Sequence, residues 1–175
     1  MTTDPRYPIG KMQFVDYSEK EKEARLADIL FLPRMLEYAV LNLDETQIQT
    51  PYRDGGWTVN QLIHHVADSH MNAFIRFKLA LTEDNPTIKP YSEAVWAELT
   101  DYKLPPFVSL ELLKGVHLKW TALLNSMTAI DFSKTYFHPE HQESFELKNA
   151  VGVYAWHCNH HFAHIEQALA AGGNY

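Results

Sequence analysis

The feature that most constrains the fold is a set of four amphipathic segments in which apolar residues recur at helical spacing. They cover residues 18–43, 57–85, 109–127 and 147–172. Residues three and four positions apart lie on one face of a helix, so each segment can bury one apolar stripe. Four such stripes in a chain of 175 residues predict a single all-α domain, residues 1–175, built as a four-helix bundle.

Capping patterns mark the ends of several of these helices. Ser18 with Glu21, and Thr58 with Gln61, have the spacing of a capping box, in which each side chain bonds the backbone N–H of the other residue. The Gly172-Gly173 pair is typical of a helix C-terminus, because glycine readily adopts the left-handed conformation found there.

The connections between the helices differ in length. Residues 86–106 hold four prolines and allow a long crossover connection, so the bundle need not be a simple up-down-up-down arrangement. Within this link, residues 92–96 are expected to form a short extra helix. Residues 134–137 and 144–147 flank a polar stretch and predict a small hairpin before the last helix.

Composition excludes several classes of partner. The formal charge of −7 argues against a nucleic-acid-binding protein, which normally shows a basic face. No apolar stretch approaches the roughly 20 residues that cross a bilayer, and the N-terminus lacks a signal-peptide pattern. Cys158 is the only cysteine, which excludes an intrachain disulfide and a cysteine-rich zinc site. We therefore expect a cytoplasmic protein that acts on a small molecule and binds neither nucleic acid nor membrane.

The ten histidines are unevenly distributed, and most gather in two groups. One group lies in the second segment (His64, His65, His70) and the other in the fourth (His157, His160, His161, His164). Two histidines four residues apart lie on one face of a helix and can bind the same metal ion. His160 with His164 and His157 with His161 both have this spacing, and helical periodicity does not choose between the pairs.

A third ligand would have to come from a neighbouring helix. His64 or His65 can supply it, because helix bundles often collect metal ligands from facing helices. Three imidazoles with one open position are typical of a catalytic metal site, whereas a fourth protein ligand such as His64 or His157 would indicate a structural one. Surplus histidines near a metal also serve as hydrogen-bond partners of the ligands, or simply pack.

Specific motifs in this chain resemble the YfiT branch of the DinB superfamily. The resemblance spans nearly the whole sequence, and its clearest motifs are Tyr52–Val59, His64–Asn72, Ile75–Leu79 and Tyr154–Ile165, with Tyr7–Gly10 near the start. It implies a four-helix bundle that carries one divalent metal ion per chain, zinc or nickel. The family pattern places the ligands at His65, before the Val-Ala-Asp triplet, and at the closing pair His160 and His164. It makes His64, His157 and His161 neighbours of the ligands.

The resemblance also implies an activity. Members of this branch are regarded as metal-dependent hydrolases, and related members look like thiol S-transferases that use a low-molecular-weight thiol such as bacillithiol. A homodimer is expected on the same basis. An ion held by three imidazoles can activate either a water molecule or a thiol, so the ligands alone do not separate these reactions. A non-catalytic metal-binding protein is the third alternative.

Three charged residues are candidates for roles beside the metal. Asp68 follows His65 by three positions, which places it on roughly the same helix face, where it can act as a base or as a structural hydrogen-bond partner. Arg53 and Arg76 are candidate substrate-binding residues, because a guanidinium binds a carboxylate with two hydrogen bonds. Each arginine can equally form a structural ion pair.

Overall fold

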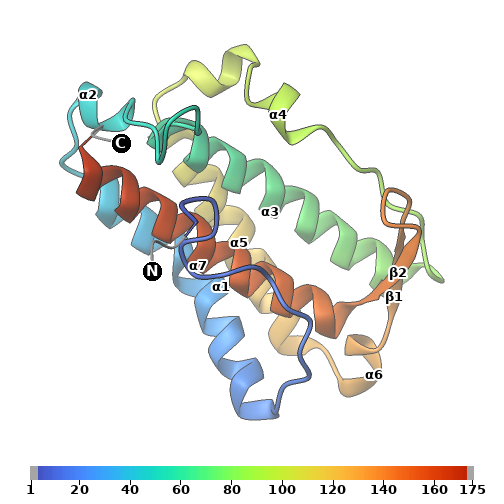
Figure 1. Cartoon of the computed structure of the whole chain (residues 1–175). Coiled ribbons are helices and arrows are strands. Elements are labelled where there is room, and N and C mark those ends of the chain that lie inside the picture. Colours follow the sequence, from blue (N-terminus) through green and yellow to red (C-terminus); the bar gives the residue numbers. More distant parts are fainter. Residues whose placement is uncertain (1–3, 173–175) are drawn as a thin grey trace.

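Four long helices form the bundle in the computed structural model, which describes residues 4–172 (Figure 1). They are α1 (Glu19–Val40), α3 (Val59–Thr82), α5 (Phe107–Ser126) and α7 (Leu147–Ala171). The connections contain the short helices α2 (Glu45–Ile48), α4 (Glu93–Trp96), η1 (Thr100–Lys103) and α6 (Ala129–Phe132). All four predicted helices are confirmed, although α1 ends at Val40 and not near Leu43.

Both predicted capping boxes are present. Ser18 caps α1 and exchanges hydrogen bonds with Glu21. Thr58 caps α3: its hydroxyl oxygen accepts from Gln61 N at 3.1 Å, and Gln61 Oε1 accepts from Thr58 N at 3.1 Å. Helix α7 ends at Gly172, which is left-handed with φ of 54°; Gly173 lies outside the described residues.

Replacing Thr58 with alanine tests how far this cap stabilises the helix that carries His65. The variant leaves first-turn amides of α3 without the side-chain acceptor. We expect the free energy of unfolding to fall by about 1 kcal/mol, with a range of roughly 0.5–2 kcal/mol. Urea denaturation monitored by circular dichroism measures this change. Thr58→Ser is the control, since its hydroxyl keeps the cap, and an equal loss in both variants would show that the cap is not responsible.

The order of the helices around the bundle departs from a simple up-down arrangement. Helix α1 packs against α5 and α7, and α3 packs against the same two helices, so α1 and α3 lie on a diagonal (Figure 1). Asn60, at the start of α3, donates to the backbone oxygens of Tyr102 and Leu104, shortly before α5 begins. Helices α3 and α5 therefore start at the same end and run in parallel, which requires the link 83–106 to return along the bundle. This confirms the predicted crossover.

The small hairpin precedes α7 as expected. Strands β1 (Thr135–His138) and β2 (Glu143–Glu146) pair antiparallel, with Thr135 opposite Glu146. Lys134 donates from its ammonium to the backbone oxygen of Leu81, near the end of α3, and Leu147 N donates to Lys134 O. These bonds fix the start of α7 beside the end of α3, so the two helices run antiparallel.

Large apolar side chains from all four long helices fill the centre of the bundle. Leu36, Phe77, Trp120 and Ile165 are among the fully buried ones. Burial of this kind is the main favourable contribution to folding. Within residues 4–172, no helix is both long and apolar enough to cross a lipid bilayer.

Candidate metal centre

His65 lies inside the bundle on α3, two turns after the Thr58 cap. It is 2% exposed, and the ring of Trp57 packs over it with centroids 4.7 Å apart. Its Nδ1 is buried and has no hydrogen-bond partner among the described residues. A buried polar nitrogen without a partner is costly, so this atom is a candidate for binding a ligand.

Two histidines of α7 face His65 across the bundle. The ring centroid of His161 lies 4.8 Å from that of His65, and the centroid of His157 lies 5.4 Å away. His157 and His161 are one helical turn apart, with centroids separated by 4.4 Å. One ring nitrogen from each of the three lies within 4.8 Å of the others. We call this set the interhelical group.

His160 and His164 are also one helical turn apart on α7, with ring centroids separated by 4.2 Å. His160 stacks on Trp156 at 4.2 Å, and His164 packs on Tyr52 at 3.9 Å between centroids. With His161 they form a second set of three ring nitrogens within 4.8 Å, which we call the α7 group. The Nδ1 atoms of His161 and His164 are 3.4 Å apart, and Nδ1 of His160 is buried without a hydrogen-bond partner.

The predicted ligand set is divided between these two groups. His65 belongs to the interhelical group, whereas His160 and His164 belong to the α7 group. His161, expected to be a neighbour of the ligands, belongs to both. The predicted set nevertheless holds three buried ring nitrogens that lack a hydrogen-bond partner among the described residues, which are Nδ1 of His65, Nδ1 of His160 and Nε2 of His164. The spacing of either pair along the helix is the same, so only packing separates them.

Burial keeps these imidazoles neutral at neutral pH. It lowers the pKa of His65 to about 4, and the nearby His160 and His164 add to this effect. Burial also lowers the pKa of His160 and of His164 to about 4, and it holds those of His157 and His161 well below the usual 6.5. A metal ligand must carry a free lone pair, so a neutral imidazole is ready to bind a cation.

The structure reveals two further histidines that the sequence motifs gave no role. His70 on α3 is fully buried, and its Nε2 lies 3.0 Å from His157 Nδ1. Its Nδ1 lies 2.8 Å from Nε2 of His117 on α5. The only sequence signal was that both are histidines in otherwise apolar helices, which does not reveal a contact between them.

Two other predicted site residues, His64 and Asp68, form hydrogen bonds to the link before α5. His64 donates from Nε2 to Leu104 O at 2.9 Å and accepts from the Ser109 hydroxyl at 2.7 Å, so it anchors the link before α5. Asp68 accepts a 2.8 Å hydrogen bond from the Tyr102 hydroxyl, and burial raises the pKa of its carboxyl.

The two arginines approach opposite sides of the histidines. Arg76 donates to the Tyr154 hydroxyl at 3.3 Å, and the Tyr154 ring lies 6.2 Å from that of His157. Arg53 donates to the Tyr52 hydroxyl and to the backbone oxygen of Asp54. Arg76 therefore reaches the interhelical group through Tyr154, whereas Arg53 reaches the α7 group through Tyr52.

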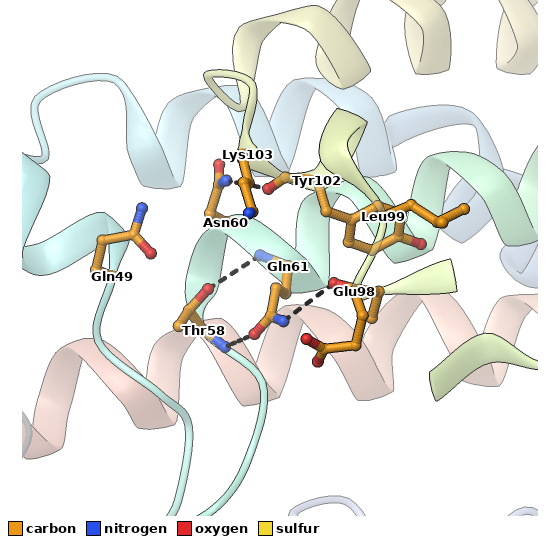
Figure 2. A pocket seen from close by; sticks show the side chains of 9 residues that line it. Gln49, Thr58, Asn60, Gln61, Glu98, Leu99, Tyr102 and Lys103 are labelled. Atoms are coloured by element: carbon orange, nitrogen blue, oxygen red, sulfur yellow. Dashed lines mark hydrogen bonds between the residues drawn. The ribbon is translucent and has the colours of Figure 1, made fainter. Parts of the chain in front are cut away.

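A surface pocket of about 290 Å³ lies at the start of α3, beside the link that contains η1 (Figure 2). Thr58 and Gln61 line it, and Gln61 also donates to the backbone oxygen of Ala97 at 3.3 Å. None of the histidines lines this pocket. Its polar groups bond to one another and hold the link in place, so the histidine groups remain the candidate site.

Comparison with known proteins decides the family. The family model described as "DinB superfamily" matches residues 29–165, which include α3, α5 and most of α7. The chain belongs to the DinB superfamily. Within that superfamily, a protein of Bacillus mycoides is 53% identical over 163 residues, which cover 93% of this chain and 94% of that protein. A protein of Bacillus thuringiensis gives the same values, and both are named "Putative metal-dependent hydrolase".

A solved DinB-like structure extends the comparison to the fold. YfiT from Bacillus subtilis is 44% identical, with a TM-score of 0.93 over 98% of this chain and 99% of that one. It is described as "a probable metal-dependent hydrolase with an unusual four-helix bundle topology". The predicted family and fold are thereby confirmed.

Proposed function

We propose that this DinB superfamily member is a metal-dependent hydrolase and that His65, His160 and His164 hold one divalent ion. The observation that carries the proposal is that Nδ1 of His65, Nδ1 of His160 and Nε2 of His164 are buried and have no hydrogen-bond partner among the described residues. Because a buried polar nitrogen without a partner is costly, a cation bound by all three would remove this cost. The names of the relatives support the same activity.

Two further observations favour this set. His160 and His164 both help to lower the pKa of His65, so both act at close range on the same imidazole. His157 and His161, by contrast, already have partners at Nδ1, which are the rings of His70 and His164 respectively.

The residues around the three imidazoles suit a hydrolytic site. When bound, a divalent ion held by neutral imidazoles supplies a Lewis acid that can activate a water molecule. Trp57 covers one side of His65 and limits the access of bulk water to it. Arg76, beside Tyr154, is our candidate for binding an acidic group of the substrate. Asp68 is bonded to Tyr102, and this contact supports the structural role over that of a base.

A metal-dependent assay tests the activity. Protein loaded with Zn²⁺ should cleave at least one class of chromogenic ester, amide or phosphoester, and stripping the metal with a chelator should abolish cleavage. His65→Gln is the matched variant, because it keeps a polar side chain of similar size but removes the imidazole. Full cleavage by this variant would contradict the proposal. Turnover that appears only with an added small thiol, and yields a conjugate, would assign the thiol S-transferase reaction to the site instead.

A further inference from the structure

The three imidazoles of the proposed metal centre are enclosed by the protein. His65, His160 and His164 are 2%, 7% and 2% exposed, and their ring nitrogens without a partner are buried. A metal ion and a substrate must nevertheless reach these nitrogens. Part of the cover over them therefore has to move, and the contacts around the site indicate which part.

Aromatic rings from outside the long helices lie over the two ligands on α7. Tyr52, in the loop before α3, packs on His164 with ring centroids 3.9 Å apart. Tyr7 lies 6.2 Å from His160 between centroids. It belongs to residues 4–11, which run across α7 (Figure 1) and which we call the N-terminal strap. The loop and the strap together cover this side of the site.

The loop that carries Tyr52 is fixed by backbone hydrogen bonds. Tyr52 N donates to Trp57 O at 3.1 Å, and Val59 N donates to Thr50 O at 3.1 Å. These bonds tie the loop directly to the first residues of α3. Moving the ring of Tyr52 away from His164 together with its backbone would break them, so the loop is the fixed part of the cover.

The strap, by contrast, is attached to α7 through side chains. Gln167 Nε2 donates to Pro5 O at 3.2 Å and to Tyr52 O at 2.7 Å, so a single amide joins the strap to the fixed loop. Trp156 Nε1 donates to Gly10 O at 3.3 Å. Gly10 has a φ of 83°, a conformation that favours glycine. The strap can therefore lift when these side-chain contacts break, while the loop and the bundle keep their own bonds.

We propose that the N-terminal strap is a gate over the metal centre and that Gln167 is the positioning residue that keeps it closed. This inference rests on the proposed function, since it concerns access to the proposed ligands. In the closed position, Tyr7 limits the access of bulk water to His160, as lids do over other active sites. Lifting the strap exposes the His160 side of the centre to a substrate.

Hydrogen exchange of the metal-free protein measures the opening of the strap. Tyr7 N donates to Asp4 O at 2.8 Å, and Gly10 N donates to Tyr7 O at 2.9 Å. These turns lack support once the strap leaves the bundle, so the two amides report its opening.

Gln167→Met keeps nearly the same side-chain length but has no N–H, and losing the bond to Pro5 should speed exchange at both amides by about 3- to 10-fold. Gln167→Glu should speed it further, because a carboxylate only accepts and would face two carbonyl oxygens. Wild-type exchange rates in both variants would overturn the inference.

The rates of Zn²⁺ entry and release test whether the strap controls access. A gate that does not bind the ion changes both rates equally. Gln167→Met should therefore raise entry, and release to an excess of chelator, by about 3- to 10-fold each, with the equilibrium affinity nearly unchanged. Trp156→Phe keeps a ring beside His160 but removes the bond to Gly10, so a similar increase is expected. Glu166→Met is the control, because this exposed neighbour on α7 lines a groove beside α1 and should leave both rates unchanged.

The outcomes separate this inference from the proposed function. If strap amides exchange faster in Gln167→Met but Zn²⁺ release does not, the strap is not a gate and only this inference fails. A lower affinity with an unchanged entry rate would show that Gln167 supports a ligand, and equal effects in Glu166→Met would show a general loosening of α7; either result overturns the gate. If His160→Ala keeps the wild-type affinity, the proposed ligand set itself fails.

Discussion

Replacing either His160 or His164 with alanine is expected to lower the affinity for Zn²⁺ by on the order of 100-fold or more. Loss of a ligand should exceed the 10- to 100-fold effect typical of residues that only support a ligand. Two remaining imidazoles leave a divalent ion with too few protein ligands for tight binding. Isothermal titration with Zn²⁺ measures the affinity, and elemental analysis of the purified variants measures the metal that they retain.

His157→Ala and His161→Ala are matched controls for this experiment. They make the same change on the same helix, also one turn apart. We expect both variants to keep more of the affinity than His160→Ala or His164→Ala, because Nδ1 of His157 and of His161 already has a partner and neither residue is a proposed ligand. The reverse pattern would support the interhelical group as the ligand set.

Lowering the pH from 7 to 5 should strongly destabilise the metal-free protein. His65, His117, His160 and His164 have folded-state pKa values of about 4, against about 6.5 in the unfolded chain. Below pH 6.5 the unfolded state therefore binds protons that the folded state does not. The stabilisation is complete above this pH and is lost as the pH falls toward 4. Each such histidine contributes about 2 kcal/mol between pH 7 and 5.

Protonation of several histidines together would lower the free energy of unfolding by an amount comparable to the whole stability of a small domain. Urea denaturation of metal-free protein at pH 7, 6 and 5 measures the loss. His117→Phe should show a shallower pH dependence, since one buried imidazole is gone. An unfolding free energy that stays constant from pH 7 to 5 would contradict the description of these imidazoles as buried and neutral.

Local features of the fold were predictable because they depend on neighbours in the sequence. The capping boxes at Ser18 and Thr58 formed as their spacing indicated, since both partners lie within one helical turn. The hairpin at 135–146 followed from a short polar stretch between two extended runs. The diagonal relation of α1 and α3 was not predicted, because it depends on how whole helices pack and not on any one segment.

The arrangement of the candidate site also depends on how whole helices pack, which local sequence patterns do not reveal. Helical spacing predicted that His157 and His161 lie one helical turn apart on α7, and the same holds for His160 and His164. Because both pairs have this spacing, it does not choose between them. Which pair faces His65 depends on the rotation of α7, which is set by contacts with α1 and α3 along its whole length. The contacts among His70, His117 and His157 join residues 47 and 87 positions apart, so no local pattern reveals them.

The hydrogen-bond partner of Asp68, a charged candidate near His65, comes from a connecting segment and not from a neighbouring long helix. Asp68 shares a helix face with His65 roughly as its spacing predicted. Its carboxylate nevertheless bonds Tyr102, which the link between α3 and α5 brings back along the bundle. A returning link of this length can place any of its side chains against α3, and no local pattern in the sequence indicates its register.

The position of the metal is the most direct test of the ligand set. Crystals of Zn²⁺-loaded protein, measured on both sides of the zinc absorption edge, locate the ion by its anomalous scattering. We predict one strong peak per chain between α3 and α7, about 2.0–2.1 Å from one nitrogen each of His65, His160 and His164. A peak bound by His157 and His161, with neither His160 nor His164 in contact, would contradict this account.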